Sequence, residues 1–171
     1  ACACVPGQVQ AGAVLDPAWA PRIEIVGTVA LIAVQPDNQA IIAGDFSAVN
    51  GVPRNRLARL KADGSLDLAF NLKAPDVFNN YIYAVAIQPD GKIIVGGDLF
   101  YFISYEAGVM DVRQYAARLD SSGTLDPSFH VGSYVDGGVD GTVRALAADA
   151  QGRILAGGDF TRISGASRPH L

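Results

Sequence analysis

The sequence predicts an all-β chain built from tandem copies of one module. Half of its 171 residues are hydrophobic and 18% are charged, a composition typical of globular chains and unlike that of disordered ones. Nineteen glycines and nine prolines are spread along the chain, as many short strands joined by tight turns require. A Gly-Asp pair followed by phenylalanine recurs three times, at Gly44-Asp45-Phe46, Gly97-Asp98-Leu99-Phe100 and Gly158-Asp159-Phe160.

Each copy contains a predicted hairpin directly before this Gly-Asp motif. An apolar strand, a polar turn and a second apolar strand follow one another over residues 33–42, 86–95 and 147–156. Proline presets its own φ, and glycine or asparagine tolerates a positive φ, so Pro-Asp-Asn and Pro-Asp-Gly supply turn chemistry in the first two copies. The third copy departs from this pattern, since Asp149-Ala150-Gln151-Gly152 stands at its turn.

A second strand–turn–strand unit follows the motif. Residues 57–70 of the first copy are echoed by residues 116–129 of the second, with Asp63-Gly64 and Ser122-Gly123 at the turns. The motif aspartates are 53 residues apart between the first two copies and 61 apart between the last two. Most of the difference is an insertion within residues 101–114. Each module therefore holds four predicted short antiparallel strands.

Four-stranded antiparallel modules repeated about every 40 to 50 residues are typical of β-propeller blades. The run Gln88–Asp98, followed by Ala117-Arg118-Leu119 and Leu125–Phe129, resembles the delta-60 repeat, a bacterial β-propeller-type module. The resemblance covers nearly the whole chain. It implies a propeller-like fold in large, often secreted or surface-exposed bacterial proteins, and it implies no catalytic residues. We expect a β-propeller-like array of three tandem four-stranded antiparallel blades, part of a larger propeller or oligomer.

The phase of the repeat divides the chain into four parts. Residues 1–22 form an N-terminal half-module, 23–75 the first repeat, 76–134 the second repeat with a loop insertion, and 135–171 an incomplete third repeat. In one interpretation the half-module is a closing hairpin that completes the last blade. In the other, which we favour, the chain is a piece of a longer protein. A closed ring of three blades would be unusually small, and incomplete end modules leave strand edges without partners, so self-association through these modules is expected.

The insertion in the second module is the main candidate binding site. It is the least repetitive and most aromatic segment, and insertions that depart from a repeat often form the binding surface. Aromatic rings stack on sugars or anchor a protein partner, so a glycan or a protein is the expected ligand. The alternative is that these rings cover their own blade. The candidate residues are Phe100, Tyr101, Phe102 and Tyr105.

Three aspartates, Asp45, Asp98 and Asp159, occupy the same place in each module. Three carboxylates around one end of a ring would suit calcium, which takes oxygen ligands from several segments. We prefer a structural interpretation, in which each carboxylate accepts backbone N–H bonds and stabilises its own turn, because a turn recurs in every copy. We therefore predict no metal site. The aromatics that end each module, Trp19, Phe70 and Phe129, are predicted to pack between neighbouring blades.

Composition argues against several classes of partner. The net charge is −4, and basic residues cluster only at Arg54, Arg56 and Arg59, so nucleic acid is not an expected partner. No apolar run approaches the 18 residues of a membrane helix, so no membrane span is predicted. Cys2 and Cys4 form neither a disulfide framework nor a metal site.

The sequence contains no recognisable catalytic motif, and no cofactor is predicted. The two histidines lie in different modules, and neither a nucleophile elbow nor a phosphate-binding loop occurs. The leading hypothesis is a non-catalytic binding or structural scaffold module of a bacterial extracellular or cell-envelope protein, which presents its blade loops to a protein or glycan. The alternatives are a propeller-type carbohydrate-active enzyme and a subunit of a surface filament or lattice.

Overall fold

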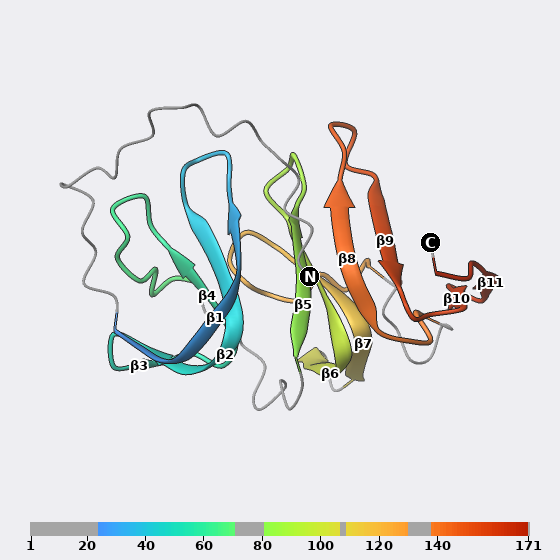
Figure 1. Ribbon diagram of the computed structural model, residues 1–171, viewed down its shortest axis with the longest axis horizontal. Coiled ribbons are helices and arrows are strands. Elements are labelled where there is room, and N and C mark those ends of the chain that lie inside the picture. The colour runs from blue at the N-terminus through green and yellow to red at the C-terminus, as the bar shows by residue number, and fades with distance from the viewer. Residues whose placement is uncertain (1–23, 71–80, 107–108, 130–137, 171) are drawn as a thin grey trace.

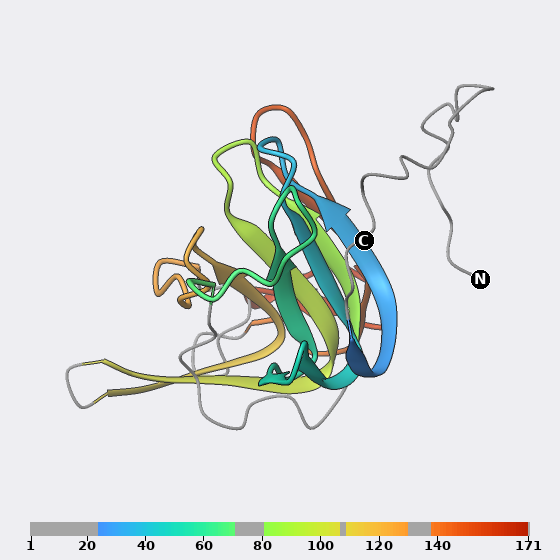
Figure 2. The same ribbon diagram turned by 90° about the vertical axis from the view of Figure 1, so that its left-hand side faces the viewer.

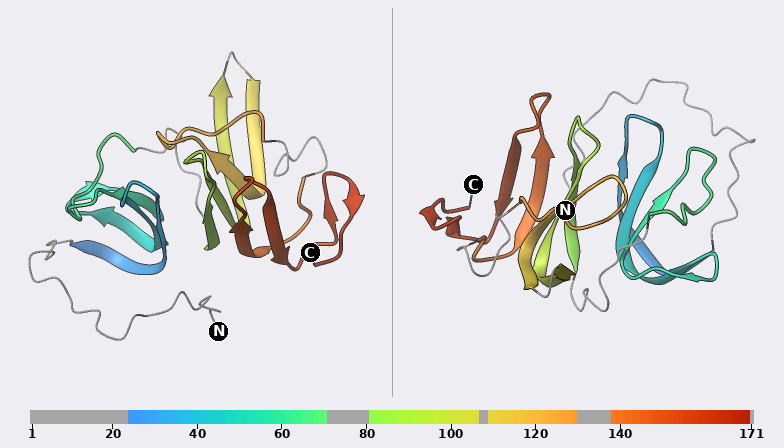
Figure 3. Two further views of the ribbon diagram at one scale, coloured as in Figure 1. Left: turned by 90° about the horizontal axis from the view of Figure 1, so that it is seen from above. Right: turned by 180° about the vertical axis from the view of Figure 1, so that it is seen from behind.

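A computed structural model of the chain describes residues 24–70, 81–106, 109–129 and 138–170. Within these ranges the regular structure is entirely β, in small antiparallel sheets that lie side by side (Figure 1). Seen from above, the sheets fan out as successive blades of one array (Figure 3). The prediction of an all-β chain is confirmed. No helix that could cross a membrane occurs among these residues.

Blade 1 is built around β1 (Ile25–Val34) and β2 (Ala40–Val49), which pair antiparallel. The first half of β2 also pairs with β4 (Leu57–Leu60), and its last two residues pair with β3 (Val52–Pro53). The strands are rich in Ile, Val and Ala, which suits sheets covered on both faces. Blade 1 therefore has β2 at its centre.

Blades 2 and 3 repeat this order. Blade 2 consists of β5 (Ile82–Ile87), β6 (Ile93–Glu106) and β7 (Val109–Leu119), with β6 at its centre. Blade 3 consists of β8 (Val143–Ala148) and β9 (Ile154–Gly158), followed by the small hairpin of β10 (Arg162–Ile163) and β11 (Ala166–Ser167). The registers show the equivalence, since Ile41, Ile94 and Leu155 lie opposite Ala33, Ala86 and Ala147.

The fourth strand expected in blades 1 and 2 is not formed among the described residues. In blades 1 and 2 the segment that should supply it makes a single bridge, Leu60 to Leu66 and Leu119 to Leu125, and then leaves the sheet. The reason lies one residue further on, where the carboxylate of Asp67 accepts the amide of Ala69 and turns the chain away from the ladder. Asp126 does the same with the amide of Ser128. Blade 1 counts four strands only because of β3.

The turns between the first two strands follow the predicted chemistry. Asn38, Gly91 and Gly152 occupy the same turn position with φ values of 64°, 82° and 78°. The substituted turn of blade 3 keeps the hydrogen-bond pattern, because Gly152 N donates to Asp149 O as Gly91 N donates to Gln88 O, both at 2.9 Å. The change of sequence in the third copy therefore preserves the hairpin.

The glycine of the Gly-Asp motif is required by close backbone packing. In each blade the innermost strand has a register shift opposite this glycine, near Ala30, Tyr83 and Arg144. A Cβ atom on Gly44, Gly97 or Gly158 would overlap a carbonyl oxygen of that strand, at Thr28, Tyr81 or Thr142. Glycine alone permits this approach of two backbones. The motif thus marks a bulge shared by all three blades.

Apolar side chains fill the space between neighbouring blades. Ile41, Ala43, Leu57 and Phe70 of blade 1 form one buried cluster with Ile82, Ile93, Val95, Ala117, Leu119 and Leu125 of blade 2. The ring of Phe70 lies directly over Gly123 of blade 2, and Phe129 clusters with Leu146, Ala148 and Ile154 of blade 3. The prediction that these aromatics pack between blades is confirmed for Phe70 and Phe129. Trp19 and the half-module 1–22 lie outside the described residues, and the module boundaries stay predictions.

Candidate functional site

The insertion of blade 2 is a two-stranded ribbon, and the prediction of a loop was wrong. In blades 1 and 3 the hairpin after the Gly-Asp motif is short, with positive φ at Asn50-Gly51 and Ser164-Gly165. In blade 2 the strands β6 and β7 continue to pair, from Tyr101 opposite Gln114 to Glu106 opposite Val109, and the ribbon projects from the body (Figure 2). Aromatic and β-branched residues favour this extended pairing over an irregular loop.

All four candidate binding residues lie in β6. Phe100 directly precedes the paired part of the ribbon, while Tyr101, Phe102 and Tyr105 lie opposite Gln114, Arg113 and Met110. The side chains of residues 99–112 are outside the described part of the structure, so the binding role of these aromatics stays a prediction. The structure brings the four residues onto one strand of one projecting element.

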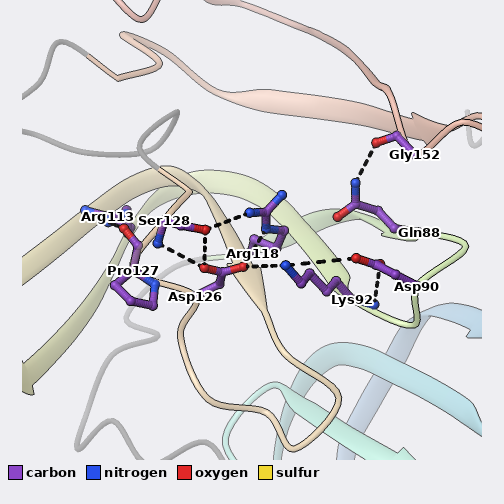
Figure 4. Close-up of polar contacts among 9 residues, drawn as sticks. All are labelled: Gln88, Asp90, Lys92, Arg113, Arg118, Asp126, Pro127, Ser128 and Gly152. Carbon is purple, nitrogen blue, oxygen red and sulfur yellow. Dashed lines mark hydrogen bonds and ion pairs between the residues drawn. The ribbon is translucent and has the colours of Figure 1, made fainter.

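Arg113 anchors the base of the ribbon. Its side chain is 2% exposed, and its Nη2 donates to the carbonyl oxygen of Pro127 at 3.2 Å (Figure 4). A buried guanidinium resists displacement, because moving it would break this hydrogen bond and leave a charged donor unsatisfied. The ribbon is therefore attached to the turn that follows blade 2, in addition to its continuity with the sheet.

The recurring aspartates Asp45, Asp98 and Asp159 do not form a cation site. No three His, Cys, Asp or Glu side chains converge as metal ligands in the described ranges. All three carboxylates contact side chains, and the predicted backbone hydrogen bonds within their own turns stay a prediction. Asp45 pairs with Arg56 at 2.9 Å, Asp98 accepts from Thr142 Oγ1 at 3.2 Å, and Asp159 accepts from Arg144 Nε at 2.7 Å.

Two arginines and two tyrosines connect all three blades. The Arg56 guanidinium of blade 1 lies over the Tyr81 ring at 5.2 Å from its centroid, and Tyr81 stacks on Tyr83 with 6.2 Å between the ring centroids. Arg144 of blade 3 then lies over Tyr83 at 5.7 Å. The hydrogen bond and charge of Asp159 raise the pKa of Arg144, and the same hydrogen bond lowers the pKa of Asp159. This stack was not predicted from the sequence. The available signal was the pair Tyr81 and Tyr83, which occurs in the second copy only.

A second recurring cluster joins an arginine, an aspartate and an aromatic ring in each complete module. Arg59 Nε donates to Asp67 at 2.8 Å, its guanidinium lies 4.8 Å from the centroid of Phe70, and its Nη1 donates to the carbonyl of Ser121 in blade 2. In blade 2, Arg118, Asp126 and Phe129 repeat the first two contacts at 2.9 Å and 4.9 Å. These clusters stabilise the turn and orient the aromatic toward the next blade.

Asp126 receives further donors that Asp67 lacks. Lys92 Nζ lies 3.0 Å from its carboxylate, and Ser128 donates its hydroxyl in addition to the amide, which has a counterpart in the amide that Ala69 donates to Asp67 (Figure 4). Gln88 Nε2 extends this polar region to blade 3 by donating to the Gly152 carbonyl at 2.6 Å. Burial by itself raises the pKa of Asp126, but hydrogen bonds from Ser128 and Lys92 and the charge of Arg118 outweigh it and hold the pKa well below its usual range.

Replacing Asp126 with asparagine is expected to destabilise the protein by about 2 kcal/mol at pH 7, because the half-buried cations Lys92 and Arg118 lose the carboxylate between them. A carboxylate whose pKa is depressed on folding stabilises the folded state above its unfolded pKa of about 3.9, and this contribution disappears as the pH falls through the lower folded pKa. Urea unfolding of both proteins should therefore show a stability gap that is constant above about pH 5 and narrows below about pH 4. A gap that stays constant to pH 2 would contradict this assignment.

Comparison with known proteins places the repeats in a described family. The family model "Domain of unknown function (DUF5122) beta-propeller" matches residues 35–70, 88–129 and 151–171, together more than half of the chain. No curated protein matches the chain. The three matched segments fall one in each blade, and they include the Gly-Asp motif of every blade and both arginine–aspartate–aromatic clusters.

Proposed function

Because the chain belongs to the DUF5122 beta-propeller family, we propose that it serves as a non-catalytic binding or structural scaffold. Membership agrees with the resemblance of its repeats to delta-60 modules. On the strength of that resemblance, the proposed setting is the cell envelope or exterior of a bacterium. The proposed ligand is a glycan or a protein that contacts the ribbon of β6 and β7.

The carboxylates support a scaffold over an enzyme. A general acid needs a pKa near the working pH, which burial and like charges provide by raising it. Hydrogen bonds and neighbouring cations instead lower the pKa of seven described aspartates against an upward effect of burial, and in Asp67, Asp120 and Asp126 burial is the largest single effect that they outweigh. These acids are committed as anions to turns and ion pairs. The seven are Asp63, Asp67, Asp120, Asp126, Asp140, Asp149 and Asp159.

The ribbon is the single observation that carries the binding part of the proposal. It lengthens a hairpin that blades 1 and 3 close with a two-residue turn, so the packing of the blades does not require it. It carries Phe100, Tyr101, Phe102 and Tyr105, and the buried Arg113 anchors its base. A preorganised element loses less entropy on binding than a flexible loop does, and aromatic residues commonly dominate binding energy.

A panel of purified bacterial polysaccharides tests this proposal. We expect the chain to bind at least one of them, and the double variant Tyr101→Ser/Tyr105→Ser to weaken that binding at least about tenfold. Leu68→Ser is the matched control, because Leu68 is 65% exposed and lies outside the ribbon. Equal affinity of the double variant and of Leu68→Ser for the polysaccharide would refute the role of the ribbon. Absence of binding by the wild type would refute the proposal that the ligand is a glycan. Release of reducing sugar from a bound polysaccharide would establish the enzyme instead.

A further inference from the structure

Apolar side chains are exposed on blades 1 and 3, the outer two of the three described blades. In blade 1, Ile32 and Val34 of β1 are 69% and 66% exposed. In blade 3, Leu155 of β9 is 58% exposed, and Ala145 and Ala147 of β8 beside it are exposed as well. Burying large apolar side chains lowers the free energy of a protein in water. Neighbouring apolar side chains that stay exposed on a sheet therefore indicate a surface to which a partner binds.

The contact between blades 1 and 2 defines two kinds of blade face. Ala33 and Ile41 lie on the face of blade 1 that packs against blade 2, which we call the trailing face. Val85, Ile87 and Ile93 lie on the face of blade 2 that receives them, which we call the leading face. Because side chains alternate along a strand, each blade has one face of each kind.

The contact between blades 2 and 3 uses the same faces in the same order. Ala86 and Ile94 form the trailing face of blade 2. Leu146, Ala148 and Ile154 form the leading face of blade 3 and pack against it. The innermost strands β1, β5 and β8 therefore follow one another side by side, as Figure 3 shows from above.

Strand register identifies the exposed residues as the unmatched members of these two faces. Ile32 and Val34 lie opposite Ile42 and Ala40, as Val85 and Ile87 lie opposite Val95 and Ile93, so they belong to the leading face of blade 1. Leu155 lies opposite Ala147, as Ile94 lies opposite Ala86, so both belong to the trailing face of blade 3. On blade 1 the exposed part of the leading face is Ile32 and Val34, since Ile42, Ala58 and Leu60 of that face are buried, and on blade 3 the exposed part of the trailing face is Ala147 and Leu155. These exposed residues are the equivalents of residues that meet each other in the contacts between blades of this chain.

We propose that a second copy of this chain docks there, with the leading face of blade 1 in one copy packed on the trailing face of blade 3 in the other. The internal contacts supply the template, since Ile32, Val34 and Ala40 would meet Ala147 and Leu155 as Val85, Ile87 and Ile93 meet Ala33 and Ile41. The contact is heterologous, because the two surfaces differ, so copies add head to tail and close into a ring or grow into a chain. This association goes beyond the proposed scaffold function and does not depend on the ribbon.

Sedimentation velocity over a range of protein concentrations tests the proposal. We expect the wild type to form oligomers, and Ile32→Glu and Leu155→Glu each to raise the dissociation constant about a hundredfold or more, because a charge would be buried without a partner. Leu68→Glu is the control, since Leu68 is equally exposed but lies on neither face. Circular dichroism and thermal unfolding establish that each variant keeps the β fold.

A mixing experiment distinguishes head-to-tail docking from any symmetric contact. Ile32→Glu retains an intact trailing face and Leu155→Glu retains an intact leading face, so an equimolar mixture should form a one-to-one complex although neither variant associates alone. A mixture that stays monomeric would overturn the proposal, as would a wild type that is monomeric at every concentration. Equal weakening by Leu68→Glu would overturn it too, because association would then not use these faces.

Discussion

Replacing Gly97 with alanine is expected to destabilise the protein by about 3 kcal/mol, at the upper end of the cost of overpacking. The added methyl group would overlap the carbonyl oxygen of Tyr81 and approach Ile82 Cα at 3.1 Å. These are backbone atoms of the neighbouring strand, so a rotamer change cannot make room. Relief requires β5 and β6 to separate, which would weaken the cluster between blades 1 and 2.

Urea unfolding of the Gly97→Ala variant measures this cost, and Gly91→Asn provides its control. Gly91 has a φ of 82° and nothing within 4 Å of an added Cβ, and blade 1 places Asn38 at the same turn position with a φ of 64°. Asparagine tolerates this conformation, so Gly91→Asn should change stability by no more than about 0.5 kcal/mol. A cost below about 1 kcal/mol for Gly97→Ala would show that the strands do not approach as closely as described.

Replacing Phe70 with alanine is expected to cost about 4 kcal/mol. The ring is 1% exposed, packs over Gly123 of the next blade and contacts the guanidinium of Arg59, so its removal leaves a cavity between two blades. The loss should also loosen the hydrogen bond from Arg59 to the carbonyl of Ser121, which the ring helps to position. Thermal unfolding should show a large decrease in the melting temperature.

Leu68→Ala is the matched control for Phe70, two residues away in the same segment. Leu68 is 65% exposed, so its truncation should change stability by less than about 0.5 kcal/mol. Phe70→Leu, which fills part of the cavity, should have an intermediate effect of about 1.5 kcal/mol. Similar effects of Leu68→Ala and Phe70→Ala would mean that the ring does not join the blades.

Local patterns were sufficient to predict the hairpins and the aromatic contacts. The turn at Gly91 depends on a positive φ within four consecutive residues, and the strands on either side depend on apolar residues in the same short window. Phe70 and Phe129 were predicted to pack between blades because a repeated module buries its aromatics only against a neighbour. The insertion also contains aromatic and β-branched residues, which favour strands, and in the structure it forms a paired ribbon where a loop was expected from the sequence.

The prediction of a fourth strand in blades 1 and 2 was wrong for a different reason. A turn and an apolar segment do follow β4 and β7, but Asp67 and Asp126 accept the amides of Ala69 and Ser128 and end the pairing after one bridge. Side-chain acceptors compete with a sheet ladder for the same amide, and sequence alone does not show which partner wins.

By itself the sequence determined the module, its turns, its apolar strands and the need for a neighbouring copy, because each follows from φ preferences and alternation within a few consecutive residues. Only the tertiary structure decided the partners of the recurring aspartates and the stack of Arg56, Tyr81, Tyr83 and Arg144. It also decided which blade faces stay exposed at Ile32 and Leu155. Equivalent positions in the repeats have the same backbone conformation. Their side chains nevertheless contact different residues, because those neighbours lie at a distance in the sequence and some belong to other blades.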